Sequence, residues 1–176
     1  MMIDFDIYKI SCNLSEPLLK EAQSWKKSHS DAPLASVLME HLLIPTKEGK
    51  SSGVEINLTF VKSVSTTQIL EAFYESFKDC DPITYTKFLD ILQSAIGSDG
   101  MKPGKVIEFH WLHGGGLLVA IDGEYKGYFD DNTIEKRLLE IYIDPHRTVS
   151  PEFVNDLLHH LEHNPHGHFI GIYHPH

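Results

Sequence analysis

The run His113-Gly-Gly-Gly116 is the first stretch whose residue types suggest chemistry. In lipases and esterases such a run supplies backbone N–H groups to an oxyanion hole, but only beside a nucleophilic serine in a Gly-x-Ser-x-Gly turn. This chain has no such pentapeptide. The glycines instead separate two short runs rich in β-branched and aromatic residues, 106–112 and 117–121. The pattern therefore favours a hairpin loop over an oxyanion hole.

Histidines form the second candidate, because seven of the 12 lie between residues 159 and 176. His159 and His163 are spaced i, i+4, which places them on one helical face where they could share a metal ion. His166 or Glu162 would supply the third ligand. The alternative is a polar helix end followed by a solvated tail that binds metal only adventitiously, and composition alone favours this alternative. We expect no cofactor.

A further pair, His110 and His113, flanks Trp111. On a strand, residues 110 and 112 share a face, while residue 113 already belongs to the glycine loop. A convergent catalytic pair is therefore disfavoured, and both histidines are interpreted as packed or exposed side chains.

Periodicity predicts the elements that position these residues. Apolar and polar residues alternate along the chain start and, most clearly, along 54–61, where Glu55 and Asn57 fall on a face that is wet or lines a polar cleft. Helical spacing and capping residues predict helices, and the Asp-Gly step at 122–123 predicts a second hairpin turn. The predicted strands are about 3–14, 54–61, 106–112, 117–121 and 125–129, and the predicted helices are about 16–28, 32–43, 66–77, 83–96, 132–143 and 151–163. Segregated helices and hairpin-linked strands indicate an α+β fold with antiparallel pairing.

Composition excludes several function classes. The 176 residues suffice for one domain with a real core, and the formal net charge is −10, with only two arginines. No Lys/Arg stripe is present to neutralise phosphates, which argues against nucleic-acid binding. No apolar stretch reaches the ~18 residues of a membrane span, so stable membrane insertion is not expected. With two cysteines and no signal-peptide pattern, we expect a cytoplasmic protein, or a periplasmic one if a leader has been removed.

Several segments in consistent order resemble the chalcone isomerase-like family. FDIYKISCNLSEPLLKEAQSW resembles the family's opening strand and helix, and GVEINLTFVKSVSTTQILEAFYESF is similar to its central strand, turn and helix. The segment from Met101 to Phe153 resembles its glycine-introduced strand, meander and late Val-Ser-Pro helix. The resemblance covers about residues 3–163. It implies an open-faced sandwich, in which helices pack on one face of a large antiparallel sheet with a cleft between them.

The resemblance also implies where a site would lie. Catalytic members use an early arginine, a threonine on the opening strand, and a tyrosine and an asparagine on the helix after the central strand. Here Tyr8 stands at the threonine position, Ile69 at the tyrosine and Ser76 at the asparagine, and no arginine precedes Arg137. The catalytic set is absent, so the resemblance implies a non-catalytic, bacterial-type member. Its ligand would be small, apolar and lipid-like, such as a fatty acid derivative.

The expected ligand-binding residues are Tyr8, Ile69, Phe73 and Ser76. Because no early arginine is available to pair with a carboxylate, neutral ligands are expected to bind better than ionised fatty acids. Two alternatives remain open: a diverged isomerase or lyase that uses other residues in the same cleft, and an interaction protein whose cleft is filled.

The expected domain spans residues 1–163, followed by a His-rich C-terminal tail over 164–176. The apolar residues Phe169, Ile170 and Ile172 in HFIGIYH leave open that this segment is a structural strand instead.

Overall fold

A computed structural model describes residues 7–47, 50–163 and 166–173. In chain order the elements are β1 (Tyr8–Leu14), α1 (Glu16–Lys27), α2 (Leu34–Leu42), β2 (Ser52–Phe60), α3 (Thr66–Phe77), α4 (Pro82–Ile96), β3 (Val106–Leu112), β4 (Leu117–Ile121), β5 (Glu124–Phe129), α5 (Asn132–Ile143), α6 (Pro151–His160), the 3₁₀ turn η1 (Leu161–His163) and β6 (His168–Tyr173). None of the described helices is long and apolar enough to span a bilayer.

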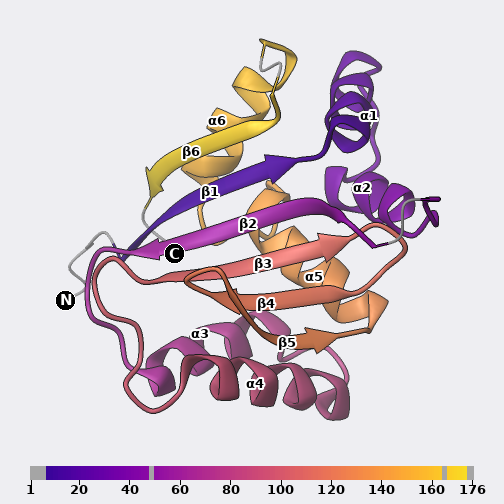
Figure 1. Cartoon of the computed structure of the whole chain (residues 1–176). Helices are drawn as coiled ribbons and strands as arrows, with labels where there is room; N and C mark the ends of the chain where they lie inside the picture. Colours follow the sequence, from indigo (N-terminus) through magenta and orange to yellow (C-terminus); the bar gives the residue numbers. More distant parts are fainter. Residues whose placement is uncertain (1–6, 48–49, 164–165, 174–176) are drawn as a thin grey trace.

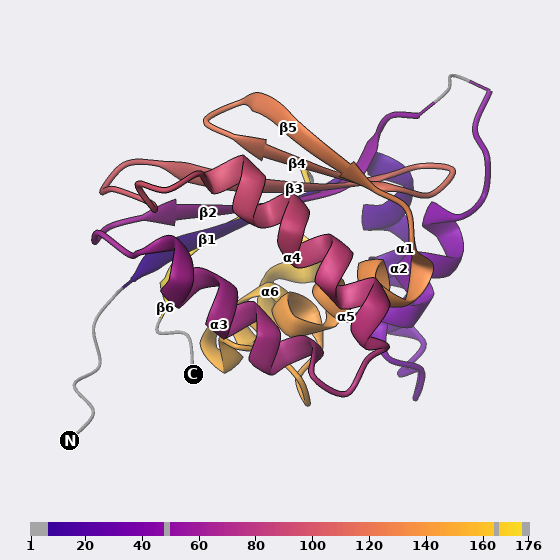
Figure 2. The same cartoon turned by 90° about the horizontal axis from the view of Figure 1, so that it is seen from below.

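The strands form one antiparallel sheet in the order β5-β4-β3-β2-β1-β6 (Figure 1). Helices α3 to α6 lie on one side of this sheet, and α1 and α2 lie at one end of it (Figure 2). The α+β open-faced sandwich is therefore confirmed.

The strand alternation decides which side chains face the helices. On β2, Val54, Ile56 and Leu58 are almost completely buried, while Glu55 and Asn57 point to the opposite face of the sheet and are half-buried. Successive side chains of a strand point to opposite faces, so one face of the sheet forms the core and the other stays polar.

Aromatic rings fill much of the layer between sheet and helices. Phe73 and Phe88, from α3 and α4, make edge-on contacts with each other at 6.1 Å between ring centroids, and Phe73 meets Phe109 of β3 at 5.8 Å. Trp111 is fully buried, and its indole N–H donates to the backbone oxygen of Glu135 at 2.8 Å. Such a partner lets a large polar-edged ring be buried without an unpaired donor.

The described residues bear differently on the two ends of the chain. The opening strand begins at Tyr8 among the described residues, and the expected alternation at residues 3 to 6 lies outside them. The boundary expected at residue 163 does not hold, because β6 pairs antiparallel with β1 from His168 to Tyr173 and is the edge strand of the same sheet (Figure 1). Without β6, the backbone N–H and C=O groups along that edge of β1 would have no partner strand.

Candidate ligand-binding cavity

A cavity of about 340 Å³ lies between the inner face of the sheet and helices α3 and α5. Its floor is formed by β1 and β2, and its walls by the two helices and the segments next to them. The lining side chains are Ile7, Tyr8, Leu58, Phe60, Lys62, Ser63, Val64, Gln68, Ile69, Ala72, Phe73, Ser76, Ile141, Tyr142 and Val149. Most are apolar, as in sites for small molecules, and the volume is at the lower end of the roughly 300–1,000 Å³ typical of them.

Helix α3 presents its side chains to the cavity because of its period. Ile69, Ala72, Phe73 and Ser76 are spaced i, i+3, i+4 and i+7, which puts them on one face. A capping box fixes the start of the helix: the hydroxyl of Ser65 accepts from the backbone N–H of residue 68, and the Gln68 side chain accepts from the backbone N–H of Ser65. Two otherwise unpaired donors are thereby satisfied, and the wall of the cavity begins at a defined residue.

Two tyrosines bring hydroxyl groups to this apolar space. Burial raises the pKa of Tyr8 above its ordinary range, and burial followed by the nearby Tyr8 raises the pKa of Tyr142. Both phenols therefore remain protonated donors at any physiological pH. Both tyrosines line the cavity, and among the described residues neither hydroxyl is hydrogen-bonded to a protein group.

All four residues expected at the site, Tyr8, Ile69, Phe73 and Ser76, line this one cavity. Their part in ligand binding stays a prediction. Tyr142 was not expected, since it belongs to α5, nearly seventy residues after α3 in the sequence. Helical periodicity identifies it as an inward-facing residue of α5 but cannot show which part of the sheet it faces.

A second pocket of about 650 Å³ adjoins the cavity and shares Ser76 with it. Both arginines of the chain lie here. Arg137 donates to Asp79 at 2.5 Å and to the backbone oxygen of Ser76 at 3.1 Å, and Arg147 pairs with Glu140 at 3.1 Å. The hydrogen bond from Arg137 lowers the pKa of the Asp79 carboxyl. The two guanidinium groups are thus already balanced by carboxylates of the protein.

The glycine loop is a hairpin between β3 and β4, as predicted, and its N–H groups are taken by the protein itself. Gly114 donates to the backbone oxygen of Leu42 at 2.6 Å, and Gly115 donates to that of Leu112 at 3.0 Å. Gly116 donates to the carboxylate of Glu135 at 2.9 Å. The loop therefore holds an internal carboxylate where an oxyanion hole would hold a substrate.

The histidines expected to bind metal do not come together. Helix α6 ends at His160, and the next three residues form a 3₁₀ turn. A 3₁₀ turn has three residues per turn, so His163 rotates away from the face of His159. His166 lies instead beside Glu16 and Lys20 of α1. Among the described residues, these three histidines form no group with converging ligand atoms.

Comparisons with known proteins find a similar protein by structure but none by sequence. No family model matches the chain, and no curated protein matches it significantly. Among solved structures it is similar to a fatty-acid binding protein from Arabidopsis thaliana, with a TM-score of 0.59 and 17% sequence identity. The match covers 93% of this chain and 84% of that one. The resemblance to the chalcone isomerase-like family is confirmed at the level of the fold.

Proposed function

We propose that this chain, with its chalcone isomerase-like fold, is a non-enzymatic protein that binds a small, lipid-like ligand in the cavity between sheet and helices. The observation that carries the proposal is the cavity itself: an apolar space of about 340 Å³ with two protonated phenols, Tyr8 and Tyr142, as its buried polar groups. Apolar walls with a few placed donors are what such ligands require.

Two further observations support this ligand class. The Arabidopsis protein of similar fold is described as fatty-acid binding. In addition, no arginine lines the cavity, and Ile69 and Ser76 stand where the catalytic members have a tyrosine and an asparagine, so the groups that stabilise a developing enolate in those members are not present at the matching positions. We therefore expect no acceleration of chalcone-to-flavanone closure above the spontaneous rate. Turnover with naringenin chalcone would instead favour a diverged isomerase.

Within this class, neutral or weakly polar ligands are expected to bind better than ionised fatty acids. No arginine lines the cavity, and both arginines of the adjoining pocket are paired with Asp79 and Glu140. A phenol O–H donates to an ester or alcohol oxygen without requiring a buried charge, whereas a carboxylate loses its hydration on entering. Among the described lining residues the cation is Lys62, so a carboxylate ligand would be expected to place its head group beside this residue.

Native mass spectrometry of freshly purified protein tests for a retained lipid. A titration with a fluorescent fatty acid and its methyl ester, side by side, then measures the preference. Tighter binding of the methyl ester is the expected result. Tighter binding of the free acid would overturn the preference for neutral ligands and indicate pairing at Lys62.

A matched pair of variants locates the binding site. Ala72 is exposed and lines the cavity from α3, so Ala72→Trp narrows the opening without disturbing the core. We expect its affinity for the methyl ester to fall at least about tenfold. Glu71→Trp places the same ring at the neighbouring exposed position, which does not line the cavity, and is expected to bind as the wild type does. Equal affinities for the two variants would place the ligand elsewhere, and no binding at all would favour an interaction protein with a filled cleft.

A further inference from the structure

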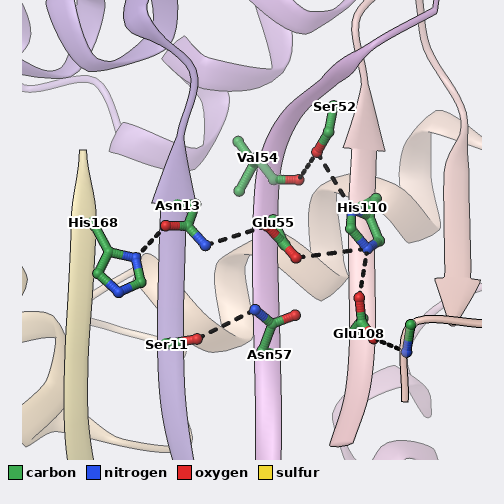
Figure 3. Close-up of polar contacts among 10 residues, drawn as sticks. Ser11, Asn13, Ser52, Val54, Glu55, Asn57, Glu108, His110 and His168 are labelled. Atoms are coloured by element: carbon green, nitrogen blue, oxygen red, sulfur yellow. Dashed lines mark hydrogen bonds and ion pairs between the residues drawn. The ribbon is translucent and has the colours of Figure 1, made fainter. Parts of the chain in front are cut away.

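The polar face of the sheet, opposite the helices, carries a compact cluster of three side chains. Glu55 on β2 is the register partner of His110 on β3, and Glu108 lies two residues before His110 on the same face (Figure 3). The His110 Nε2 atom is 3.2 Å from Glu108 Oε1 and 3.8 Å from Glu55 Oε1. All three side chains are well shielded, with 12%, 15% and 27% of the side chains of His110, Glu108 and Glu55 exposed.

Neighbouring groups hold the two carboxylates in place. The amide N–H of Asn13 donates to Glu55 Oε2 at 3.2 Å, and the backbone N–H of Gly123 donates to Glu108 Oε2. In each glutamate the second oxygen, Oε1, is the one directed at His110 (Figure 3). Among the described residues no lysine or arginine pairs with either carboxylate.

The hydroxyl of Ser52 lies beside the second ring nitrogen of His110. Ser52 Oγ donates to the backbone oxygen of Val54 at 3.3 Å and lies 3.4 Å from His110 Nδ1. In the tautomer that carries the proton on Nδ1, the ring donates to this hydroxyl and the lone pair of the neutral ring lies on Nε2. Three lone-pair donors then converge: Nε2 and the two Oε1 atoms. Lone pairs that face one another repel, so a positive charge, either a metal ion or a proton, is needed between them.

An independent observation comes from Asn57. Its amide group donates to Ser11 Oγ at 3.3 Å, but its Oδ1 atom is buried and has no hydrogen-bond partner among the residues that the structure describes. Asn57 is the register partner of Glu108, and its oxygen points toward β3 (Figure 3). Buried acceptors are normally satisfied, so this oxygen beside the cluster remains able to accept from, or to coordinate, a group that the described part of the protein does not supply.

We propose that Glu55, Glu108 and His110 form a binding site for a divalent first-row transition metal ion, with Zn²⁺ as the best match and Asn57 as a neighbouring oxygen donor. Zn–N and Zn–O bonds of about 2.0–2.2 Å at tetrahedral angles place neighbouring ligand atoms about 3.4 Å apart, close to the distances from Nε2 to the two carboxylates. A mixed nitrogen and oxygen set suits Zn²⁺ better than Ca²⁺ or Mg²⁺, which take six or more oxygens. The outer contacts of Ser52 and Asn13 are of the kind that orient metal ligands.

The test uses the full chain, stripped with a chelator and titrated with Zn²⁺ against a chromophoric zinc indicator, with Mg²⁺ and Ca²⁺ in parallel. Because the C-terminal histidines can bind zinc on their own, the reference is a variant with alanine at histidines 159, 160, 163, 166, 174 and 176. This variant is expected to retain one tight zinc site. Retention of tight zinc by the wild type but not by this variant would overturn the proposal.

Substitutions within the cluster supply the specific readout. In the background of this six-histidine variant, Glu108→Gln is expected to weaken zinc binding at least about a hundredfold, and Ser52→Ala about tenfold, in line with the loss of an outer contact. Glu124→Gln removes the same charge from an exposed site on β5 and is expected to leave the affinity unchanged. Unchanged affinity in Glu108→Gln, or in Ser52→Ala if Glu108→Gln fails to fold, would overturn the proposal.

NMR separates a bound metal from a bound proton. On addition of Zn²⁺ the ¹⁵N shift of His110 Nε2 is expected to move while that of Nδ1 keeps its protonated value. If pH alters the His110 shifts but Zn²⁺ does not, the positive charge among the three donors is a proton and the metal site is refuted.

Discussion

Replacing Ile69 by aspartate puts a charge into the wall of the proposed ligand cavity. Ile69 lies on the inward face of α3 and only 5% of it is exposed, so nearly the whole side chain is removed from water in the native state. Losing that burial costs about 1.5–3 kcal/mol. For a chain of this size each kcal/mol lowers the melting temperature by about 2–4 °C, so we expect Ile69→Asp to melt about 3–12 °C below the wild type.

The effect on ligand binding should be larger than the effect on stability. In the empty cavity the new carboxylate keeps water, but an apolar ligand displaces that water and leaves the charge uncompensated. Burying an unpaired ion costs several kcal/mol, and about 1.4 kcal/mol corresponds to a factor of ten in affinity. The affinity for the fatty acid methyl ester should therefore fall at least about a hundredfold.

The assay is a fluorescence titration at a temperature where circular dichroism shows every variant folded. Ile69→Asn separates polarity from charge and is expected to lose less affinity than Ile69→Asp. Thr67→Asp adds the same charge to an exposed position of α3 outside the cavity lining and should bind normally. Wild-type affinity in folded Ile69→Asp would refute the location of the ligand between the sheet and α3.

Three further outcomes follow from the structure. Gly114→Ala and Gly116→Ala both place a side chain at positive φ, which costs about 1–3 kcal/mol of stability. Only at residue 116 would the added Cβ also lie 2.4 Å from the Tyr128 hydroxyl, so urea unfolding should show the larger loss of unfolding free energy for Gly116→Ala. Equal losses for the two variants would contradict this packing. Burial raises the pKa of Glu135, and the hydrogen bond from Gly116 offsets part of this rise, so the folded protein keeps this proton to higher pH than the unfolded chain does. The stability therefore falls as the pH rises from the ordinary carboxyl pKa of about 4.3 through the raised value. Glu135→Gln should reduce the slope of stability against pH in this range, and identical slopes for variant and wild type would argue against a buried carboxyl. Deleting residues 164–176 removes β6 and exposes the edge of β1, so a clearly lower melting temperature is expected, whereas an unchanged one would restore the interpretation of this segment as a dispensable tail.

Local sequence signals were sufficient for most of the elements. Ser65 caps α3 and Asp131 caps α5, and in each case the cap directly precedes the residue at which the sequence predicts the helix to begin. Ser15 does occupy the N-cap position of α1, yet its hydroxyl contacts His113 Nε2 at 3.1 Å instead of a backbone N–H of the helix. The sequence predicts where α1 begins, but a loop almost a hundred residues away decides what its capping hydroxyl binds.

The cavity was predictable in part. The resemblance to the chalcone isomerase-like family, together with the helical period of α3, predicted four of its lining residues. Tyr142 and Lys62 could not be assigned to the same space, because which face of α5 meets which strand depends on packing between segments that are far apart in sequence. The position of the arginines was equally beyond prediction from the sequence. The sequence shows that no arginine lies near the start of the chain, but only the fold places Arg137 beside Ser76.

The sequence by itself determined the alternation of the strands, the hairpin at the glycine loop and the polar character of the open face, because each depends on residues within one element or one turn. Tertiary structure alone decided the pairing of β6 with β1 and the meeting of Glu55 with His110. A shift of one residue in the register of β2 and β3 would move one set of side chains to the opposite face, and no local signal fixes that register. Glu55 and Asn57 were correctly expected on the polar face, but their neighbours on β3 are set by inter-strand hydrogen bonds and by the packing of the other face against the helices.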